Sequence, residues 1–159
     1  MERLWAPWRM TYINGDMCSG KCFICAAAGD PEADAANLVV WRNDLAICIM
    51  NRFPYNNGHL LVAPVRHGGE MGELDEAERS ALFAGLVDSK ALLERVMAPQ
   101  GFNVGLNLGR TAGAGLVDHL HFHIVPRWDG DTNFMPVLGD TKVMPQALSD
   151  LYDKLVSQL

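Results

Sequence analysis

The most regular stretch of the sequence is His119-Leu120-His121-Phe122-His123-Ile124-Val125, in which imidazoles and apolar residues alternate strictly. Alternate residues of an extended strand point to opposite faces of a sheet, so this stretch predicts a strand with three histidines on one face. The other face consists of Leu120, Phe122 and Ile124 and is expected to lie against the core. The stretch therefore predicts a sheet that presents a row of imidazoles on one side.

Three imidazoles on one strand face can serve three purposes. They can form the solvated face of an amphipathic strand, although such faces normally carry Thr, Lys, Glu and Ser. They can bind zinc through their ring nitrogens. They can also attack phosphorus, because imidazole is largely neutral near pH 7 and the phosphoramidate it forms is easily broken by a second acceptor. We favour this chemistry, which requires one ring nitrogen to face the phosphorus while the other donates its proton to a fixed acceptor.

The regions around the histidine stretch predict a sheet and two helices. Apolar residues recur at helical spacing over residues 74–97, and Asp75 with Glu78 resembles a capping box. A second helix is expected over residues 145–159, starting at a proline, and a polar loop over residues 29–37. Short apolar runs predict strands at residues 38–41, 45–50, 59–65, 102–108 and 119–125. The predicted fold is α+β, an antiparallel sheet of about five strands with one long helix and a C-terminal helix.

The length and composition of the chain predict a single domain. With 159 residues, 49% of them hydrophobic and 20% charged, the chain can bury one core. Within this single domain, residues 1–159, we expect an aromatic N-terminal arm (1–17), a cysteine segment (18–28) and a C-terminal extension (129–159). The arm contains Leu4-Trp5-Ala6-Pro7-Trp8-Arg9-Met10, and its aromatic anchors suit packing onto this subunit or its neighbour.

Charge and cysteine usage narrow the partners and the compartment. The net charge of -6 provides no positive surplus for a nucleic-acid polymer. The sequence contains no apolar run of about eighteen residues and no hydrophobic leader, so we expect no membrane partner and a cytoplasmic protein. Cys18, Cys22 and Cys25 fall close together, which suits a metal site or reduced thiols better than a disulfide framework.

A loop of small residues precedes the histidine stretch. It runs Asn107-Leu108-Gly109-Arg110-Thr111-Ala112-Gly113-Ala114-Gly115 and ends four residues before His119. Glycine permits tight turns with positive φ, which can aim backbone N–H groups at an anion. A plain turn is the alternative, but the position of the loop beside the histidines favours a phosphate contact.

The alternating pattern of residues 119–125 resembles the His-x-His-x-His-x-x signature, x being apolar, of the histidine triad (HIT) superfamily. The similarity extends to residues 51–62 and to Pro126-Arg127, and it covers roughly residues 22–127. The segment 126–134, together with the N-terminal arm, resembles the bacterial branch that includes diadenosine tetraphosphate phosphorylases. The resemblance implies a HIT-like fold and a homodimer or larger homo-oligomer.

The same resemblance implies an activity. The chain would be a hydrolase or transferase of nucleotidyl phosphate bonds that works through a covalent nucleotidyl-histidine. Its substrate would be a dinucleoside polyphosphate such as diadenosine tetraphosphate, or another AMP-linked compound, and a phosphorylase would release ADP and ATP. Those phosphorylases tend to carry a serine where this chain has Gly115, which leaves a dinucleoside polyphosphate hydrolase or a nucleoside phosphoramidase as alternatives. A non-catalytic nucleotide-binding module is a further alternative, against which the intact triad argues.

The resemblance also assigns roles to residues. His119, His121 and His123 would be catalytic, with His121 as the nucleophile and His123 on the phosphate. Asn51 would bind the ribose hydroxyls; the alternative is an ordinary asparagine at the entry of a turn. His59 would support the site by contacting the residues that bind the nucleotide. Further contacts would come from phosphate ligands at Asn107, Gly113 and Gly115, and from apolar residues around the base at Phe23, Ile49 and Phe53.

A zinc site is also expected. Cys22 and Cys25 have the spacing of half a tetrahedral zinc site, which His67 and His119 could complete, as in related members of the superfamily. Such a zinc would be structural, because four protein ligands leave no open position for water, and His119 would then not be a free phosphate contact. The alternatives are reduced thiols near the base, or Cys18 as a competing ligand. No organic cofactor is expected.

Overall fold

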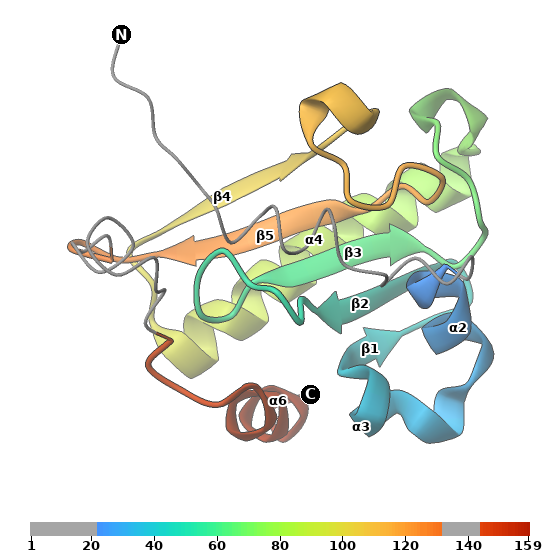
Figure 1. Cartoon of the computed structure of the whole chain (residues 1–159). Helices are drawn as coiled ribbons and strands as arrows, with labels where there is room; N and C mark the ends of the chain where they lie inside the picture. The colour runs from blue at the N-terminus through green and yellow to red at the C-terminus, as the bar shows by residue number, and fades with distance from the viewer. Residues whose placement is uncertain (1–21, 132–143) are drawn as a thin grey trace, which may run out of the picture.

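The computed structural model describes residues 22–131 and 144–159 of the chain (Figure 1). The predicted aromatic arm, Cys18 and residues 132–143 of the predicted C-terminal extension lie outside these residues. The described part contains a five-stranded antiparallel sheet in the order β1-β2-β3-β5-β4. The strands are β1 (Val39–Arg42), β2 (Ala46–Met50), β3 (Leu60–Pro64), β4 (Gly101–Leu106) and β5 (Phe122–Arg127). The predicted α+β fold, with its long helix and C-terminal helix, is confirmed.

Helices lie on both sides of this sheet (Figure 1). On one side, α4 (Glu76–Met97) packs against β2, β3 and β5, and α6 (Leu148–Val156) contacts α4 and β1. On the other side, α2 (Phe23–Gly29) covers part of β2 and β3 through a second, smaller core cluster. Burial on both faces explains why these two strands are uninterrupted apolar runs instead of alternating ones.

The strand register determines which side chains share a face with the histidines. His123 of β5 lies opposite Leu61 of β3, and Leu61 lies opposite Ile49 of β2. Ile49 belongs to the core cluster under α2, so His123 points to the side of the sheet away from α4. Its neighbour Ile124 is fully buried in the main core under α4.

The start of α4 follows the predicted capping box. The Asp75 side chain accepts a hydrogen bond from the Glu78 N–H (2.8 Å), and the Glu78 carboxylate accepts one from the Asp75 N–H (2.9 Å). The Glu78 carboxylate also receives two hydrogen bonds from Arg66 (2.7 and 2.8 Å). The helix start is thereby tied to the residue that precedes His67.

Several boundary predictions were wrong, and two of them concern helical segments. Residues 29–37 form no simple loop but two short helices, η1 (Pro31–Ala33) and α3 (Asp34–Asn37). Pro31 opens η1, and the Arg42 guanidinium bonds Asp34 and two carbonyls at the end of α2, which orders the segment. The C-terminal helix begins at Leu148, after the predicted start at residue 145.

The histidine strand also begins later than predicted, at Phe122 instead of His119. The Leu120 N–H donates to the Gly68 carbonyl oxygen (2.7 Å), so at this point the chain pairs with the loop after β3. The predicted strand 102–108 ends at Leu106. No helix within the described ranges is both long enough and apolar enough to cross a membrane.

Candidate active site

The three alternating histidines are withdrawn from solvent. His119 is 0% and His121 is 8% exposed, and His123 is half-buried. Leu120 and Ile124, on the opposite parity, are 3% and 0% exposed in the main core. The alternative of a solvated strand face is therefore excluded. The alternating apolar residues Leu120 and Ile124 lie in the core, as predicted.

His121 is held in one tautomer by the backbone. Its Nδ1 lies 2.8 Å from the carbonyl oxygen of His119, and a carbonyl oxygen can only accept, so Nδ1 carries the proton. Nε2 then carries the lone pair. Burial lowers the pKa of His121, against the hydrogen bond to His119, which raises it. The ring is thus neutral at physiological pH and meets the requirement of a nucleophile with one nitrogen tied to a fixed acceptor.

His119 has the opposite tautomer. Its Nε2–H donates to the carbonyl oxygen of Pro64 (2.8 Å), which leaves the lone pair on Nδ1. That nitrogen lies 3.3 Å from Nδ1 of His67, 3.2 Å from Sγ of Cys22 and 3.4 Å from Sγ of Cys25. Burial lowers the pKa of His119 as well. The lone pair is therefore directed at three other atoms of the kinds that can bind a metal ion.

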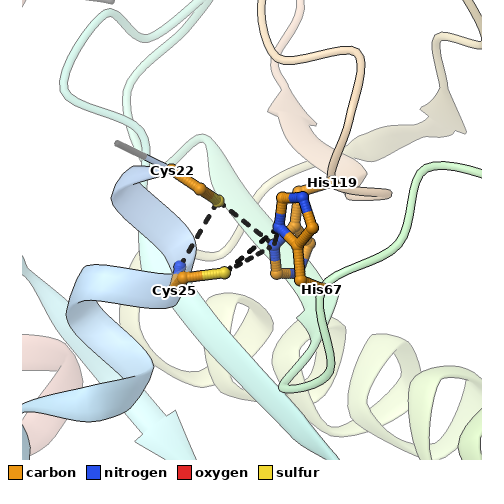
Figure 2. A group of neighbouring side chains, drawn as sticks. All are labelled: Cys22, Cys25, His67 and His119. Carbon is orange, nitrogen blue, oxygen red and sulfur yellow. Dashed lines mark hydrogen bonds between the residues drawn. The ribbon is translucent and has the colours of Figure 1, made fainter. Parts of the chain in front are cut away.

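Figure 2 shows these four side chains pointing toward one another from segments far apart in the sequence. Cys22 is the N-cap of α2 and Cys25 lies in its first turn, His67 follows β3, and His119 precedes β5. All four ligand atoms lie within 4.8 Å of one another. The predicted set of Cys22, Cys25, His67 and His119 is thus brought together as a group that could hold a metal ion.

The spacing of this group fits a tetrahedral ion. With Zn–N near 2.0–2.1 Å and Zn–S near 2.3 Å, the edges of a tetrahedral site are about 3.3–3.8 Å long. The two imidazole nitrogens are 3.3 Å apart, and Sγ of Cys25 lies 3.2 Å from Nδ1 of His67. Burial, followed by the contact with Cys22, raises the pKa of the Cys25 thiol to about 11. Without a cation the cluster holds protons that a metal would displace.

His123 contacts His59, a histidine outside the alternating stretch. His59 is 1% exposed, and its Nε2 lies 2.9 Å from Nδ1 of His123. The rings of His121 and His123 are neighbours, with centroids 5.0 Å apart. Across the sheet His123 faces Gly105 of β4, where an added Cβ would meet no atom of the described residues within 4 Å. The described residues therefore leave room beside Gly105 on the face of the sheet that carries His123.

The residues expected around a nucleotide occupy different environments. Phe53 is 46% exposed in the loop after β2 and Phe23 is 43% exposed on α2, whereas Ile49 is 3% exposed within the core. The amide of Asn51 contacts the Phe53 N–H (2.9 Å) and Nδ1 of His59 (3.3 Å). Their roles toward base and ribose stay predictions.

The small-residue loop before the triad contains the expected left-handed glycines. Gly109 has φ 78° and Gly113 has φ 88°. The Gly113 N–H donates to the Arg110 carbonyl oxygen (2.9 Å), and the Ala114 N–H donates to the carbonyl oxygen of Gly109 (3.3 Å). These amides are used within the loop, so a phosphate contact from the backbone would fall nearer Gly115. The contacts predicted for Asn107, Gly113 and Gly115 stay predictions.

Three features of the site went unrecognised in the sequence. The carbonyl oxygens of Pro64 and His119 fix the tautomers of two histidines. Gly69 packs so closely that an added Cβ would lie 2.6 Å from the carbonyl oxygen of Val117. The Gly68-Gly69 pair directly after His67 was the one available signal, since adjacent glycines mark a close backbone approach.

Comparisons with known proteins agree with this geometry. A family model described as HIT domain matches residues 32–130. An AP-4-A phosphorylase of Mycobacterium tuberculosis (strain CDC 1551 / Oshkosh) is 40% identical over 156 residues, which covers 94% of this chain and 80% of the relative. The adenosine 5'-monophosphoramidase hnt1 of Schizosaccharomyces pombe is 29% identical, covering 87% of this chain and 98% of the relative. A zinc-bound histidine triad family protein from Mycobacterium smegmatis has a TM-score of 0.68 at 21% identity, covering 87% of this chain and 93% of that one.

Proposed function

This chain belongs to the HIT domain family, and from that premise we propose that it is an enzyme that transfers a nucleotidyl group through His121. The proposed substrate class is the dinucleoside polyphosphates, with phosphate as the second acceptor. The 40% identity to an AP-4-A phosphorylase supports this choice over the other nucleotide chemistries of the family.

One observation carries the proposal. The His121 Nδ1–H donates to the His119 carbonyl oxygen at 2.8 Å, in a ring that is 8% exposed and whose pKa is lowered by burial. The proton is therefore held away from Nε2, and Nε2 keeps a lone pair without needing a separate base. A residue that only binds nucleotide has no need of such a nitrogen at the centre of the row.

The proposed reaction has two steps. In the first, the Nε2 lone pair of His121 attacks the phosphorus, an N–P bond forms, and the P–O bond to the leaving nucleoside polyphosphate breaks with its electron pair on oxygen. The positive charge on the ring is stabilised through Nδ1–H by the His119 carbonyl oxygen. In the second, an oxygen of phosphate attacks the same phosphorus, and the N–P pair returns to Nε2. Diadenosine tetraphosphate would give ATP and ADP.

Incubation with diadenosine tetraphosphate, with and without inorganic phosphate, tests the proposal. We expect ADP and ATP only when phosphate is present, and no turnover by His121→Ala, which removes the attacking nitrogen and lowers the rate by at least about 1,000-fold. AMP and ATP without added phosphate would favour the hydrolase alternative. Binding without turnover in the intact protein would favour the non-catalytic module, and unchanged turnover in His121→Ala would defeat the assignment.

A phosphoramidase is the second candidate. It is supported by the relative described as an adenosine 5'-monophosphoramidase, whose whole length is nearly covered. Gly115 adds to this case, because it supplies no hydroxyl where phosphorylases of the family tend to carry serine. Release of AMP from adenosine 5'-monophosphoramidate, faster than any cleavage of diadenosine tetraphosphate, would favour this candidate.

We also propose that Cys22, Cys25, His67 and His119 hold a structural zinc ion. The support is their convergence, the 3.3 Å separation of the imidazole nitrogens, and a lone pair on His119 Nδ1 that is fixed by Pro64. When bound, zinc would supply a cross-link and no catalysis, because the four protein ligands fill a tetrahedron. It would join α2 to the backbone that carries the acceptor of His121.

A homodimer is proposed as the assembly. β4 is at one end of the sheet and pairs only with β5 among the described strands. Its Val104 is 52% exposed, and on α4 Phe83 and Val87 are 71% and 52% exposed. An edge strand and exposed apolar side chains suit pairing with a second copy. The molecular mass in solution tests this proposal.

A further inference from the structure

We propose that Asn51 and His59 act as positioning residues that fix the tautomer of His123, with the proton on Nε2, opposite to the tautomer of His121. The assignment follows from hydrogen bonds among described residues alone. Its catalytic consequence rests on the proposed function, because it concerns the ring beside the proposed nucleophile.

The chain of contacts begins at the Asn51 amide. The Phe53 backbone N–H lies 2.9 Å from Oδ1 of Asn51, and a backbone N–H can only donate. The carbonyl end of the side-chain amide must therefore face Phe53, which settles which end is oxygen and which is nitrogen. The NH2 group then faces Nδ1 of His59, at 3.3 Å.

His59 Nδ1 receives a second donor. The backbone N–H of Tyr55 lies 3.0 Å from this nitrogen, so two N–H groups are directed at the same atom. Nδ1 of His59 must carry a lone pair and no proton. Because the residue is 1% exposed, a protonated Nδ1 would confront two donors without water to relieve them. His59 is thus neutral, with its proton on Nε2.

The proton of His59 determines the state of His123. Nε2 of His59 lies 2.9 Å from Nδ1 of His123, and since Nε2 carries the hydrogen it donates. Nδ1 of His123 is then the acceptor and is unprotonated. The His123 ring is therefore neutral and bears its hydrogen on Nε2.

The two neighbouring rings end in opposite states. The His119 carbonyl oxygen holds the proton of His121 on Nδ1, and the contact with His59 holds that of His123 on Nε2. His121 therefore has a lone pair on Nε2, whereas His123 has an N–H on Nε2. The centroids of the two rings are 5.0 Å apart. Phosphoryl oxygens only accept hydrogen bonds, so a nucleophilic nitrogen beside a fixed N–H donor is the pair that transfer from a phosphate needs.

Long-range ¹H–¹⁵N correlation spectra of protein labelled at the histidine nitrogens test the assignment directly, because the cross-peak pattern distinguishes the two neutral tautomers. In the full-length protein at neutral pH without substrate, we expect His59 and His123 as Nε2–H and His121 as Nδ1–H. A spectrum with His123 as Nδ1–H, or with His121 and His123 in the same tautomer, would overturn the inference. No variant is needed for this result.

Two variants of His59 distinguish its hydrogen bond to His123 from the packing of its ring. His59→Phe removes the donor to His123 while it keeps a ring, and we expect His123 to occupy both tautomers and kcat to fall about 100-fold with less change in KM. His59→Gln can offer its side-chain N–H at the position of Nε2, and we expect it to restore the single tautomer and much of the rate. Persistence of pure Nε2–H His123 in folded His59→Phe would contradict the role of His59.

The same measurements distinguish this inference from the proposed function. The tautomers are read without substrate, whereas turnover of diadenosine tetraphosphate is read without labels. The expected tautomers in a protein that cleaves no nucleotide would refute the proposed function and leave the assignment of His123 standing. Turnover by a protein in which His123 is Nδ1–H would do the reverse.

Discussion

The two ends of the histidine row each contain a close pair of imidazoles, and the pairs differ in what they can hold. At one end Nδ1 of His67 and Nδ1 of His119 are 3.3 Å apart; at the other, Nε2 of His59 and Nδ1 of His123 are 2.9 Å apart. His119 donates from its far nitrogen to the Pro64 carbonyl oxygen, so a lone pair faces its neighbour. The far nitrogen of His59 accepts from the Tyr55 N–H, so a hydrogen faces its neighbour.

This difference indicates that the far contact of each ring decides its chemistry. A lone pair next to two sulfur atoms and a second imidazole suits a cation. The hydrogen that His59 Nε2 donates to His123 Nδ1 keeps that nitrogen unprotonated, so the N–H donor of His123 is at Nε2. Between the two pairs, His121 depends on the first through the carbonyl oxygen of His119 and lies beside the second through His123.

The largest expected effect comes from breaking the first pair of rings. Cys25→Ser removes one of the four converging ligands, and we expect loss of one zinc per chain and a fall in the free energy of unfolding of about 3–4 kcal/mol when free zinc is at roughly 100–1,000 times its Kd. Metal content by mass spectrometry and denaturant unfolding measure the two effects.

Cys48→Ala is the matched control for that experiment. Cys48 is fully buried in the main core under α4 and is not one of the four clustered ligands, so its variant should lose packing energy but keep the metal. Equal metal content in Cys25→Ser and the intact protein would contradict the zinc site. The tautomer of His123 should be unchanged in Cys25→Ser, because its fixing contacts come from His59.

How much of this site the sequence predicts depends on which atoms are involved. The sheet, the long helix and the grouping of Cys22, Cys25, His67 and His119 followed from alternation, helical spacing and the family pattern. The late start of β5 did not, because it depends on a hydrogen bond between Leu120 and Gly68, far apart in the chain. The tautomers were equally hidden, since they are set by backbone groups that every residue carries.

A medium effect is expected at Gly69, which allows the loop of His67 to approach the segment before His119. An added Cβ would lie 2.6 Å from the Val117 carbonyl oxygen, so Gly69→Ala must push these segments apart. We expect a loss of about 1–3 kcal/mol in the free energy of unfolding and weaker zinc binding. Gly72→Ala is the control, because a Cβ there meets no described atom within 4 Å. Equal zinc affinity in the two variants would show that the close approach is not needed.

The smallest expected effect concerns the acid side of stability, through the contact that ties the His67 loop to α4. Arg66, foremost by its hydrogen bonds, lowers the pKa of Glu78 from 4.5 to about 2, so the folded state holds this proton less tightly than the unfolded chain does. The resulting stabilisation is complete above pH 4.5 and is lost as the pH falls through about 2.

Glu78→Gln tests this contact, because glutamine can keep the capping box but cannot titrate. The difference in unfolding free energy between the intact protein and the variant should shrink steadily from pH 5 to the lowest accessible pH, measured by urea unfolding. Glu94→Gln serves as the control, since Glu94 pairs only with Lys90 among the described ion pairs and both side chains are about half exposed. A pH-independent difference for Glu78→Gln would mean that the ion pair with Arg66 does not hold the His67 loop in solution. The position of His67 next to His119 would then depend only on the contacts within the Cys22, Cys25, His67 and His119 cluster.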